Sequence, residues 1–352
     1  MLERTESRPD LQRLDRWDIA SLILAVLALW LVLHLHILSV LLSALLVYEL
    51  VDLTVPSFRR FGVNAALAKT FSIAVITAAI AGALLVLSLW LGSFIAAGGQ
   101  PIQELMSQMA VALEHIRPNL PQWAADLIPA DLNALKVLGA DWLRSNGRQV
   151  ASVGQDVGRL TVHIIIGIAI GALVAFSHEI GEQVTGAADR RRPPLAEAGR
   201  RRSRNLAVAF RQVVFSQVRI SAVNTALTGF FLAVVMPLVG VPLPLTKTLI
   251  VVTFVVGLLP VIGNLISNTA IALVALSVSP YAAAGALVFL IVIHKLEYFL
   301  NAAIIGSRIH ARAWELLVAM IVMEAAFGVA GLIAAPVFYA FAKLELRQAG
   351  MI

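Results

Sequence analysis

Long uncharged stretches alternate with short polar segments along the whole chain. Each stretch approaches or exceeds the roughly 20 residues that a helix needs to cross a bilayer. The stretches are apolar all round, whereas barrel strands alternate between apolar and polar positions, so we expect helices. This pattern predicts an all-α, polytopic membrane protein with about eight transmembrane segments. The stretches are Ile19–Tyr48, Thr70–Gln103, Leu160–Ser177, Ile220–Thr246, Thr248–Ile293 and Ala325–Ala342.

One of these stretches, Thr248–Ile293, is too long for a single crossing. Its 46 residues would form a helix of about 69 Å. Pro260, with Gly257 and Gly263 beside it, predicts a Pro/Gly-broken or re-entrant helix, and "SVSPY" (Ser277–Tyr281) marks a second boundary. Non-helical backbone is tolerated at membrane depth only beside protein or a water-filled cavity, which is how broken helices form transporter sites.

The first uncharged stretch requires a choice between one helix and two. If the N-terminus and Arg59 both lie inside, Ile19–Val51 must cross twice, as two short helices that turn near His34 and His36. A single long tilted helix is the alternative, and we favour two helices. The first run is too long for a signal-peptide h-region, so we expect it to remain in the protein.

Composition supports a membrane location and explains the positive charge. Hydrophobic residues make up 59% of the chain and charged residues 14%, with a mean hydropathy of +0.87, which a soluble surface cannot accommodate. The net charge of +6 comes largely from "DRRRPPLAEAGRRRSRN" (Asp189–Asn205). This segment predicts a basic inner loop that orients the chain and contacts anionic lipids, and it does not indicate a nucleic-acid partner. Its arginines are Arg190, Arg191, Arg192, Arg200, Arg201, Arg202 and Arg204.

The polar segment before that loop has helical periodicity of its own. Apolar residues recur at helical spacing between residues 98 and 158, which predicts outer amphipathic helices at the membrane surface. Gly167 and Gly171 follow in a G-x-x-x-G spacing, which either allows close helix packing or arises by chance. The predicted divisions of the chain are 1–97, 98–158, 159–215 and 216–352.

Several polar residues near the predicted break could line a solute path. Asn264 and Asn268 share one helical face, where they either bind a solute or satisfy carbonyls freed at Pro260. His294, Glu297 and Asn301 form a polar ladder at i, i+3 and i+7. Protonation of the carboxylate could be coupled to solute movement. The alternative is an interfacial helix end anchored by its neighbouring polar side chains.

A second acid lies inside the last apolar helix. Glu324 shares a predicted face with Gly328, Gly331 and Ala335, and such a stripe of small residues faces packed protein or a cavity. We interpret Glu324 as part of the path or its gate, against a structural hydrogen bond to another helix. Pro336 is predicted to kink the helix where the stripe ends.

Motifs for the common enzyme chemistries are missing from the sequence. It contains no G-x-x-x-x-G-K-[ST] loop, no H-E-x-x-H zinc pair, no G-x-S-x-G elbow and no cysteine. "HEIGE" (His178–Glu182) lacks the second histidine of a zinc motif. We therefore predict that the protein is not an enzyme and requires no metal or cofactor.

The C-terminal region resembles a known family. "LLPVIGNLISN", "SVSPY", "HKLEYFLNAAIIGSRIHARAWELL" and "MEAAFGVAGLIAAPVFYAFAKLEL" resemble, in order and spacing, the signature of the autoinducer-2 exporter family of bacterial membrane proteins. The family's Pro-x-x-Gly falls on Pro260 and Gly263, its acid on Glu297, and its Phe-Gly-x-x-Gly on Phe327, Gly328 and Gly331; its Ile-x-Gly ends at Gly306.

The resemblance implies a secondary transporter of the bacterial inner membrane that assembles as a homo-oligomer, with a pentamer as the expected form. Our leading hypothesis is export of a small polar solute, such as the quorum signal autoinducer-2, driven by protons or the membrane potential. One alternative is a Na⁺ or Li⁺/proton antiporter. Another is a membrane scaffold without transport. Both termini are predicted to be cytoplasmic.

Overall fold

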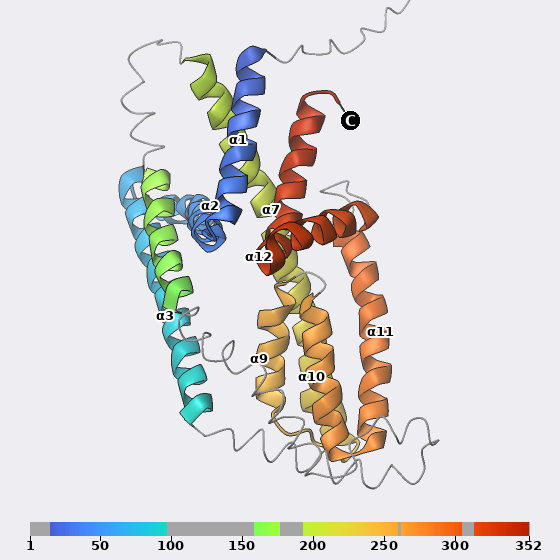
Figure 1. The fold of residues 1–352 in the computed structure, drawn as a ribbon. Helices are drawn as coiled ribbons and strands as arrows, with labels where there is room; N and C mark the ends of the chain where they lie inside the picture. Colours follow the sequence, from blue (N-terminus) through green and yellow to red (C-terminus); the bar gives the residue numbers. More distant parts are fainter. Residues whose placement is uncertain (1–14, 97–157, 177–192, 260–261, 305–312, 352) are drawn as a thin grey trace, which may run out of the picture. The chain divides into compact units, whose positions relative to one another are not determined.

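The computed structural model of the 352-residue chain is helical throughout its described part (Figure 1). It describes residues 15–96, 158–176, 193–259, 262–304 and 313–351. Within these ranges, six helices are long and apolar enough to cross a membrane, and three shorter apolar helices accompany them. The predicted all-α, polytopic fold class is confirmed. The count of about eight crossings stays a prediction, and the outer amphipathic segment lies almost entirely outside the described residues.

The chain divides into two compact units. Unit 1 comprises Met1–Ala79, Leu160–Val214 and Ile309–Ile352, and unit 2 comprises Ile80–Arg159 and Phe215–Arg308. The boundary falls inside α3 (Ala65–Ala96) and inside α7 (Pro194–Phe230), so both helices contribute to both units. The sequential four-part division expected from the sequence stays a prediction.

Unit 1 begins with two helices. α1 (Arg16–His34) starts at Asp15, whose side chain caps the Arg16 amide, and α2 (Leu38–Arg60) follows after a short turn. His36 adopts a left-handed conformation with φ of 58° in the turn between the helices. The predicted turn near His34 and His36 is therefore confirmed, and the single long helix is wrong.

The helix Gly158–Phe176 packs closely on α2. A methyl group added at Gly167 would lie 2.6 Å from the Val40 carbonyl oxygen, and one at Gly171 would lie 2.5 Å from that of Ala44. Because both contacts are with backbone, neither can be relieved by a side-chain rotation. The packing interpretation of the G-x-x-x-G spacing is confirmed.

The basic segment was predicted to be a loop, but its described part from Pro194 onward is helical. α7 begins at Pro194 and continues for 37 residues, so Arg200–Arg204 are helical. Proline is favoured in the first turn of a helix, and the alanines, arginines and leucines that follow are good helix formers. After α7 the chain continues through a π-helical turn, η2 (Phe231–Val235), and a short helix, α8 (Met236–Leu238). Residues 189–192 lie outside the described part.

The last helix, α12 (Ala313–Gln348), bends at Gly328. Gly328 has φ of 61° and ψ of −146°, a combination that essentially only glycine adopts. Pro336 lies inside the helix, eight residues after this interruption, and its predicted kink stays a prediction. Because helical periodicity is lost at Gly328, Glu324 does not continue onto one regular face with Gly331 and Ala335.

The two halves of α12 fold back toward each other. The Glu315 carboxylate, in the first half, forms an ion pair of 2.5 Å with Lys343 and accepts a hydrogen bond from the Tyr339 hydroxyl, both in the second half. Near the bend, a side chain at Gly331 would overlap the Met323 carbonyl oxygen. Glycine at this position therefore permits the close return of the backbone.

Unit 2 contains the divided apolar stretch. α9 (Thr246–Gly257), α10 (Ile262–Val278) and α11 (Pro280–Ile304) follow one another, and α10 packs against both of its neighbours (Figure 1). The Ser279 hydroxyl caps the start of α11 by accepting from the Ala282 amide. Both predicted boundaries are confirmed. With 12 and 17 residues, α9 and α10 are about 18 and 26 Å long, shorter than the bilayer core.

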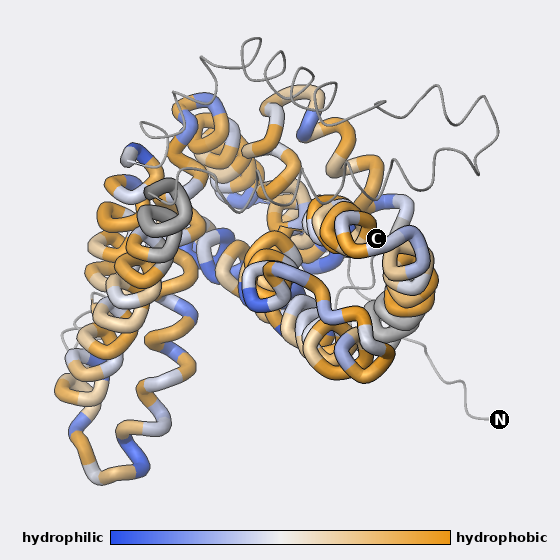
Figure 2. The backbone as a smooth tube through the Cα atoms, turned by 90° about the horizontal axis from the view of Figure 1, so that it is seen from below, coloured by the Kyte–Doolittle hydropathy of each residue, from blue (hydrophilic) through white to orange (hydrophobic). Residues whose placement is uncertain are grey.

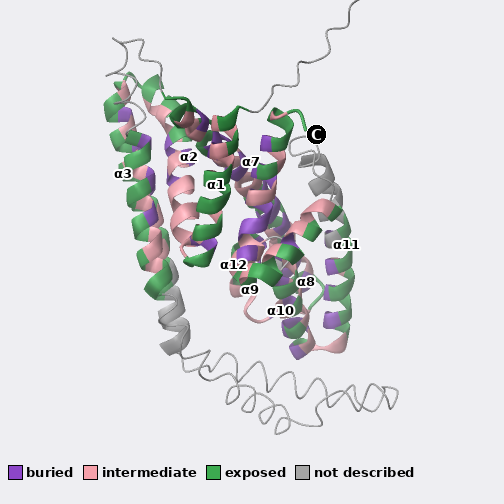
Figure 3. Cartoon of the chain, turned by 45° about the horizontal axis from the view of Figure 1, so that its top comes forward, coloured by how far each residue is buried: buried purple, intermediate pink, exposed green. Residues whose placement is uncertain are grey.

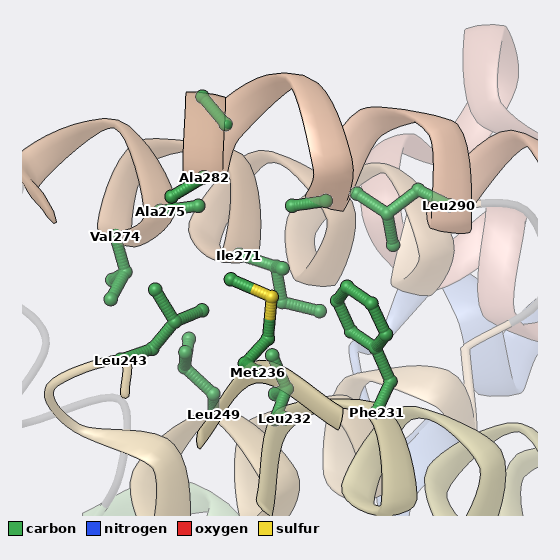
Figure 4. Packing of buried hydrophobic residues seen from close by; sticks show 12 residues of the cluster. Phe231, Leu232, Met236, Leu243, Leu249, Ile271, Val274, Ala275, Ala282 and Leu290 are labelled. Atoms are coloured by element: carbon green, nitrogen blue, oxygen red, sulfur yellow. The ribbon is translucent and has the colours of Figure 1, made fainter. Parts of the chain in front are cut away.

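An apolar cluster holds these short helices together. Phe231 of η2 stacks on Phe289 of α11 with ring centroids 3.9 Å apart. Leu232 and Ile271 are fully buried between the helices, and Ala275 and Ala282 allow α10 and α11 to approach (Figure 4). The cluster positions α9 and α10 and therefore the break between them.

Many apolar side chains are nevertheless exposed. Figure 2 shows hydrophobic residues along the helices of the chain, and Figure 3 shows exposed residues on many of the same helices. Ile23, Val26 and Leu27 of α1 are each more than half exposed. Such faces suit a protein whose outer solvent is hydrocarbon.

Candidate functional site

The break between α9 and α10 leaves backbone carbonyls that side chains of α7 satisfy. The Gln217 amide donates a hydrogen bond of 2.7 Å to the Gly257 carbonyl oxygen, and the Ser221 hydroxyl donates one of 2.8 Å to that of Phe254. The last four carbonyls of a helix have no partner within it, and in an apolar setting each unpaired group costs several kcal/mol. These two contacts therefore stabilise a helix end inside the unit.

Two glycines allow the chain to turn so tightly at the break. A methyl group at Gly257 would lie 2.6 Å from the Ser221 hydroxyl oxygen, and one at Gly263 would overlap the Val256 carbonyl. The backbone therefore excludes a side chain at Gly263, whereas one at Gly257 would displace the Ser221 hydroxyl. Gly257 was predicted for gating or packing, and its packing contact with Ser221 is now evident.

An amide pair lies just beyond the break. Asn224 of α7 donates a hydrogen bond of 3.4 Å to the side-chain oxygen of Asn264, and the Thr228 hydroxyl donates one of 3.5 Å to Asn224. Both bonds are long for their type. Asn224 and Thr228 are buried, and Asn264 is half-buried.

Two further hydroxyls, one on α7 and one on α9, have free hydrogen-bonding capacity. In the part of the chain that the structure describes, the Thr225 and Thr253 hydroxyl oxygens are buried without a hydrogen-bond partner. A buried hydroxyl left unpaired costs about 1–3 kcal/mol, so a bound water or solute that paired with it would be stabilised.

Polar residues of α7 thus form a continuous stripe that the sequence interpretation missed. Gln217, Ser221, Asn224 and Thr228 lie at i, i+4, i+7 and i+11, which places them on one helical face; we call them the α7 polar stripe. The signal was available in the sequence, because this spacing begins at Gln217 and continues into the uncharged stretch Ile220–Thr246. It was overlooked because none of the four residues is charged.

The other predicted path residues are only partly placed. Asn268 lies one turn beyond Asn264 on α10 and is half-buried. His294, Glu297 and Asn301 belong to α11, but the structure describes only their backbone and not their side chains. Pro260 and Gly306 lie outside the described residues. Their predicted roles stay predictions.

Glu324 belongs to unit 1, whereas the break belongs to unit 2. Its side chain is exposed on the first half of α12. Among the described residues, no group of three or more histidines, aspartates and glutamates could hold a metal ion.

The arginines of α7 have different surroundings. Arg201 is exposed and pairs with Asp18 at 2.5 Å, Arg200 is half-buried, and Arg204 is exposed. The prediction that these arginines contact lipid is wrong for Arg202. Its side chain is 6% exposed and forms an ion pair with Glu345 of α12. The topological role of the segment stays a prediction, and Arg190, Arg191 and Arg192 lie outside the described residues.

Polar contacts surround the Arg202–Glu345 pair. Arg202 also donates to the Asp18 carbonyl at 3.2 Å, and Asn205 donates to Glu345 at 2.8 Å and to Gln348 at 2.7 Å. These residues connect α1, α7 and α12 within unit 1. The sequence did not point to Glu345, because it lies at the end of an apolar run. Its partners Arg202 and Asn205 are more than a hundred residues away in the sequence.

The sequence model of the AI-2E family transporter matches residues 19–348. The chain belongs to the AI-2E transporter family. The match covers both compact units and includes the broken helix and the Gly328 bend, so the resemblance found in the C-terminal signature is confirmed. A comparison with curated proteins gave no significant match.

Membership establishes the general class of this AI-2E family protein. It is a multi-pass membrane transporter and not an enzyme, and a transporter implies a transported solute. The alternative of a scaffold without transport is therefore set aside.

Proposed function

We propose that this AI-2E family transporter exports a small, uncharged polar solute across the bacterial inner membrane, through a path lined by the α7 polar stripe and the α9–α10 break. Autoinducer-2 and similar hydroxyl-rich metabolites are the solutes of this class. The observation that carries the proposal is the set of amides and hydroxyls at the broken helix, two of whose hydroxyls are buried without partners in the described part of the chain. Such groups recognise hydroxyl and carbonyl groups of a solute.

The same arrangement favours a solute over the alternative of a Na⁺ or Li⁺/proton antiporter. Sodium sites in broken-helix transporters use carbonyls at half-helix C-terminal ends. Here a cation at the Phe254 and Gly257 carbonyl oxygens would compete with the hydrogen bonds that Ser221 and Gln217 donate to them. The described side chains of the stripe also contribute no carboxylate.

We further propose that Glu297 couples transport to protons. The protein assembles as a homo-oligomer, with a pentamer as the expected form. Both termini are on the cytoplasmic side in this arrangement, which the basic residues around Arg59 and Arg200 support. Glu324 lies on the exposed first half of α12, where it has a role in gating.

Replacing Asn224 by leucine is expected to reduce transport at least about tenfold, because the substitution removes a polar contact from the middle of the proposed path. The measurement is flux of autoinducer-2 and a panel of polyols into proteoliposomes under imposed proton and sodium gradients. Ala226→Leu is the matched control, since Ala226 lies on the exposed side of the same helix. Wild-type flux by Asn224→Leu at equal protein abundance would refute the path, and cation flux alone would favour the antiporter.

Glu297→Gln is expected to abolish the pH dependence of transport while solute binding persists, because glutamine imitates the protonated acid. Flux is measured at a series of pH values with equal protein in the vesicles. Glu324→Gln serves as the comparison and should keep the wild-type profile. The assignment of coupling to Glu297 is wrong if its variant keeps the pH profile or if Glu324→Gln alone loses it.

A further inference from the structure

A basic cavity lies in unit 1, whereas the proposed solute path belongs to unit 2. The cavity has a volume of about 610 Å³ and is formed by α2, the first turns of α3 and the C-terminal end of the helix Gly158–Phe176. Its polar lining residues are Tyr48, Asp52, Arg59, Arg60 and Lys69. The remaining walls are apolar and include Val51, Val55 and Pro56.

The charges of the described lining residues are unbalanced. Among them, three cationic side chains face one carboxylate, and that carboxylate, Asp52, is 3.5 Å from the guanidinium of Arg211. Lys69 uses part of its capacity on the Ala175 carbonyl, at 3.3 Å. Across the ranges that the structure describes, the guanidinium groups of Arg59 and Arg60 have no hydrogen-bond or ion-pair partner. Two guanidinium groups are therefore available at the cavity.

The cavity adjoins apolar surface. Phe61, directly after Arg60, is 84% exposed, and Leu67 and Phe71 on α3 are each about half exposed. Phe71 also stacks on Phe58 of α2, with centroids 6.4 Å apart, so the rings bridge the two helices. Exposed aromatic residues beside cationic side chains at the end of a spanning helix are typical of the membrane interface.

We propose that this cavity binds the phosphate of an anionic phospholipid, whose acyl chains lie along Phe61 and the exposed apolar face of α3. The planar guanidinium groups of Arg59 and Arg60 match phosphate oxygens in paired hydrogen bonds. Basic cavities between spanning helices suit lipid headgroups of this kind. A soluble phosphate would use the same cationic groups and would leave the apolar surface without a partner. The inference does not depend on the solute or on the direction of transport.

The test uses the purified full-length protein in detergent micelles. Native mass spectrometry measures the dissociation constants of phosphatidylglycerol and phosphatidylcholine, and glycerol 3-phosphate is tested as the soluble source of phosphate. We expect phosphatidylglycerol to bind about tenfold or more tightly than phosphatidylcholine, and Arg59→Gln with Arg60→Gln to weaken it about tenfold. The matched control, Lys247→Gln with Arg347→Gln, removes the same charge at two exposed positions and should change binding by less than about twofold.

A variant with the opposite effect separates binding from misfolding. Asp52→Asn removes the carboxylate from the lining and should tighten phosphatidylglycerol binding, which a damaged fold would not do. Equal weakening by the lining pair and the control pair, or no strengthening by Asp52→Asn, would overturn the site. If glycerol 3-phosphate bound as tightly as the lipid with the same dependence on Arg59 and Arg60, the lipid assignment would be overturned.

Discussion

Replacing Glu345 by alanine is expected to lower the free energy of unfolding by about 3–5 kcal/mol. The substitution would leave Arg202, which is 6% exposed, as a buried charge without its partner. It would also remove the acceptor of the 2.8 Å hydrogen bond from Asn205. The loss is measured by reversible unfolding of the purified protein in mixed micelles with increasing denaturing detergent.

Two comparisons isolate the cause of this loss. Arg202→Met combined with Glu345→Leu should restore stability to near that of the wild type, because an apolar pair of similar volume carries no desolvation cost. Arg201→Gln breaks the neighbouring ion pair between Arg201, whose side chain is 45% exposed, and Asp18, whose side chain is 25% exposed. This substitution should lower the free energy of unfolding by less than about 1 kcal/mol. If Glu345→Ala were no worse than Arg201→Gln, the buried pair would not have the stabilising role given to it here.

Gly328→Ala is expected to straighten or destabilise α12, at a cost of about 1–3 kcal/mol, because alanine does not adopt the backbone conformation of this residue without strain. The contact between Glu315 in the first half and Lys343 in the second should then be lost. Since the chain contains no native cysteine, cysteines introduced at these two positions can be crosslinked cleanly. The crosslink should form efficiently with Gly328 present and drop at least about fivefold with Gly328→Ala.

Gly82→Ala provides the control for that substitution. Gly82 lies inside α3 with open space around it, so alanine there should preserve or slightly raise stability. Transport by Gly328→Ala should fall in proportion to the lost crosslink if the bend is required for function. Full crosslinking in Gly328→Ala would show that the fold of α12 does not depend on this glycine.

The features that the sequence predicted well are those that depend on local chemistry. The turn at His36 follows from the position of basic ends around a long apolar run, and the division at Pro260 follows from length and missing hydrogen bonds. The position of the bend in α12 could not be predicted in the same way. Pro336 is buried within a continuous helical half, whereas Gly328 takes a conformation that only the folded-back contacts select.

Features that depend on distant partners were predicted least well. The environment of Arg202 is set by Glu345, more than a hundred residues away, so the basic segment gave no sign that one of its arginines is buried. The α7 polar stripe is an intermediate case. Its spacing is visible in the sequence, but its place at the break depends on the packing of α7 against α9 and α10.

The bend at Gly328 also bears on how the protein matches the thickness of its bilayer. A straight helix of 36 residues would be about 54 Å long, far beyond a hydrocarbon core of about 30 Å. Tilt alone accommodates only a smaller excess than this one. Divided at Gly328, the helix has a second half of about 30 Å and a shorter first half tied back to it through Glu315. A single backbone torsion, and not a steep tilt, therefore resolves the hydrophobic mismatch of the longest apolar helix near the C-terminus.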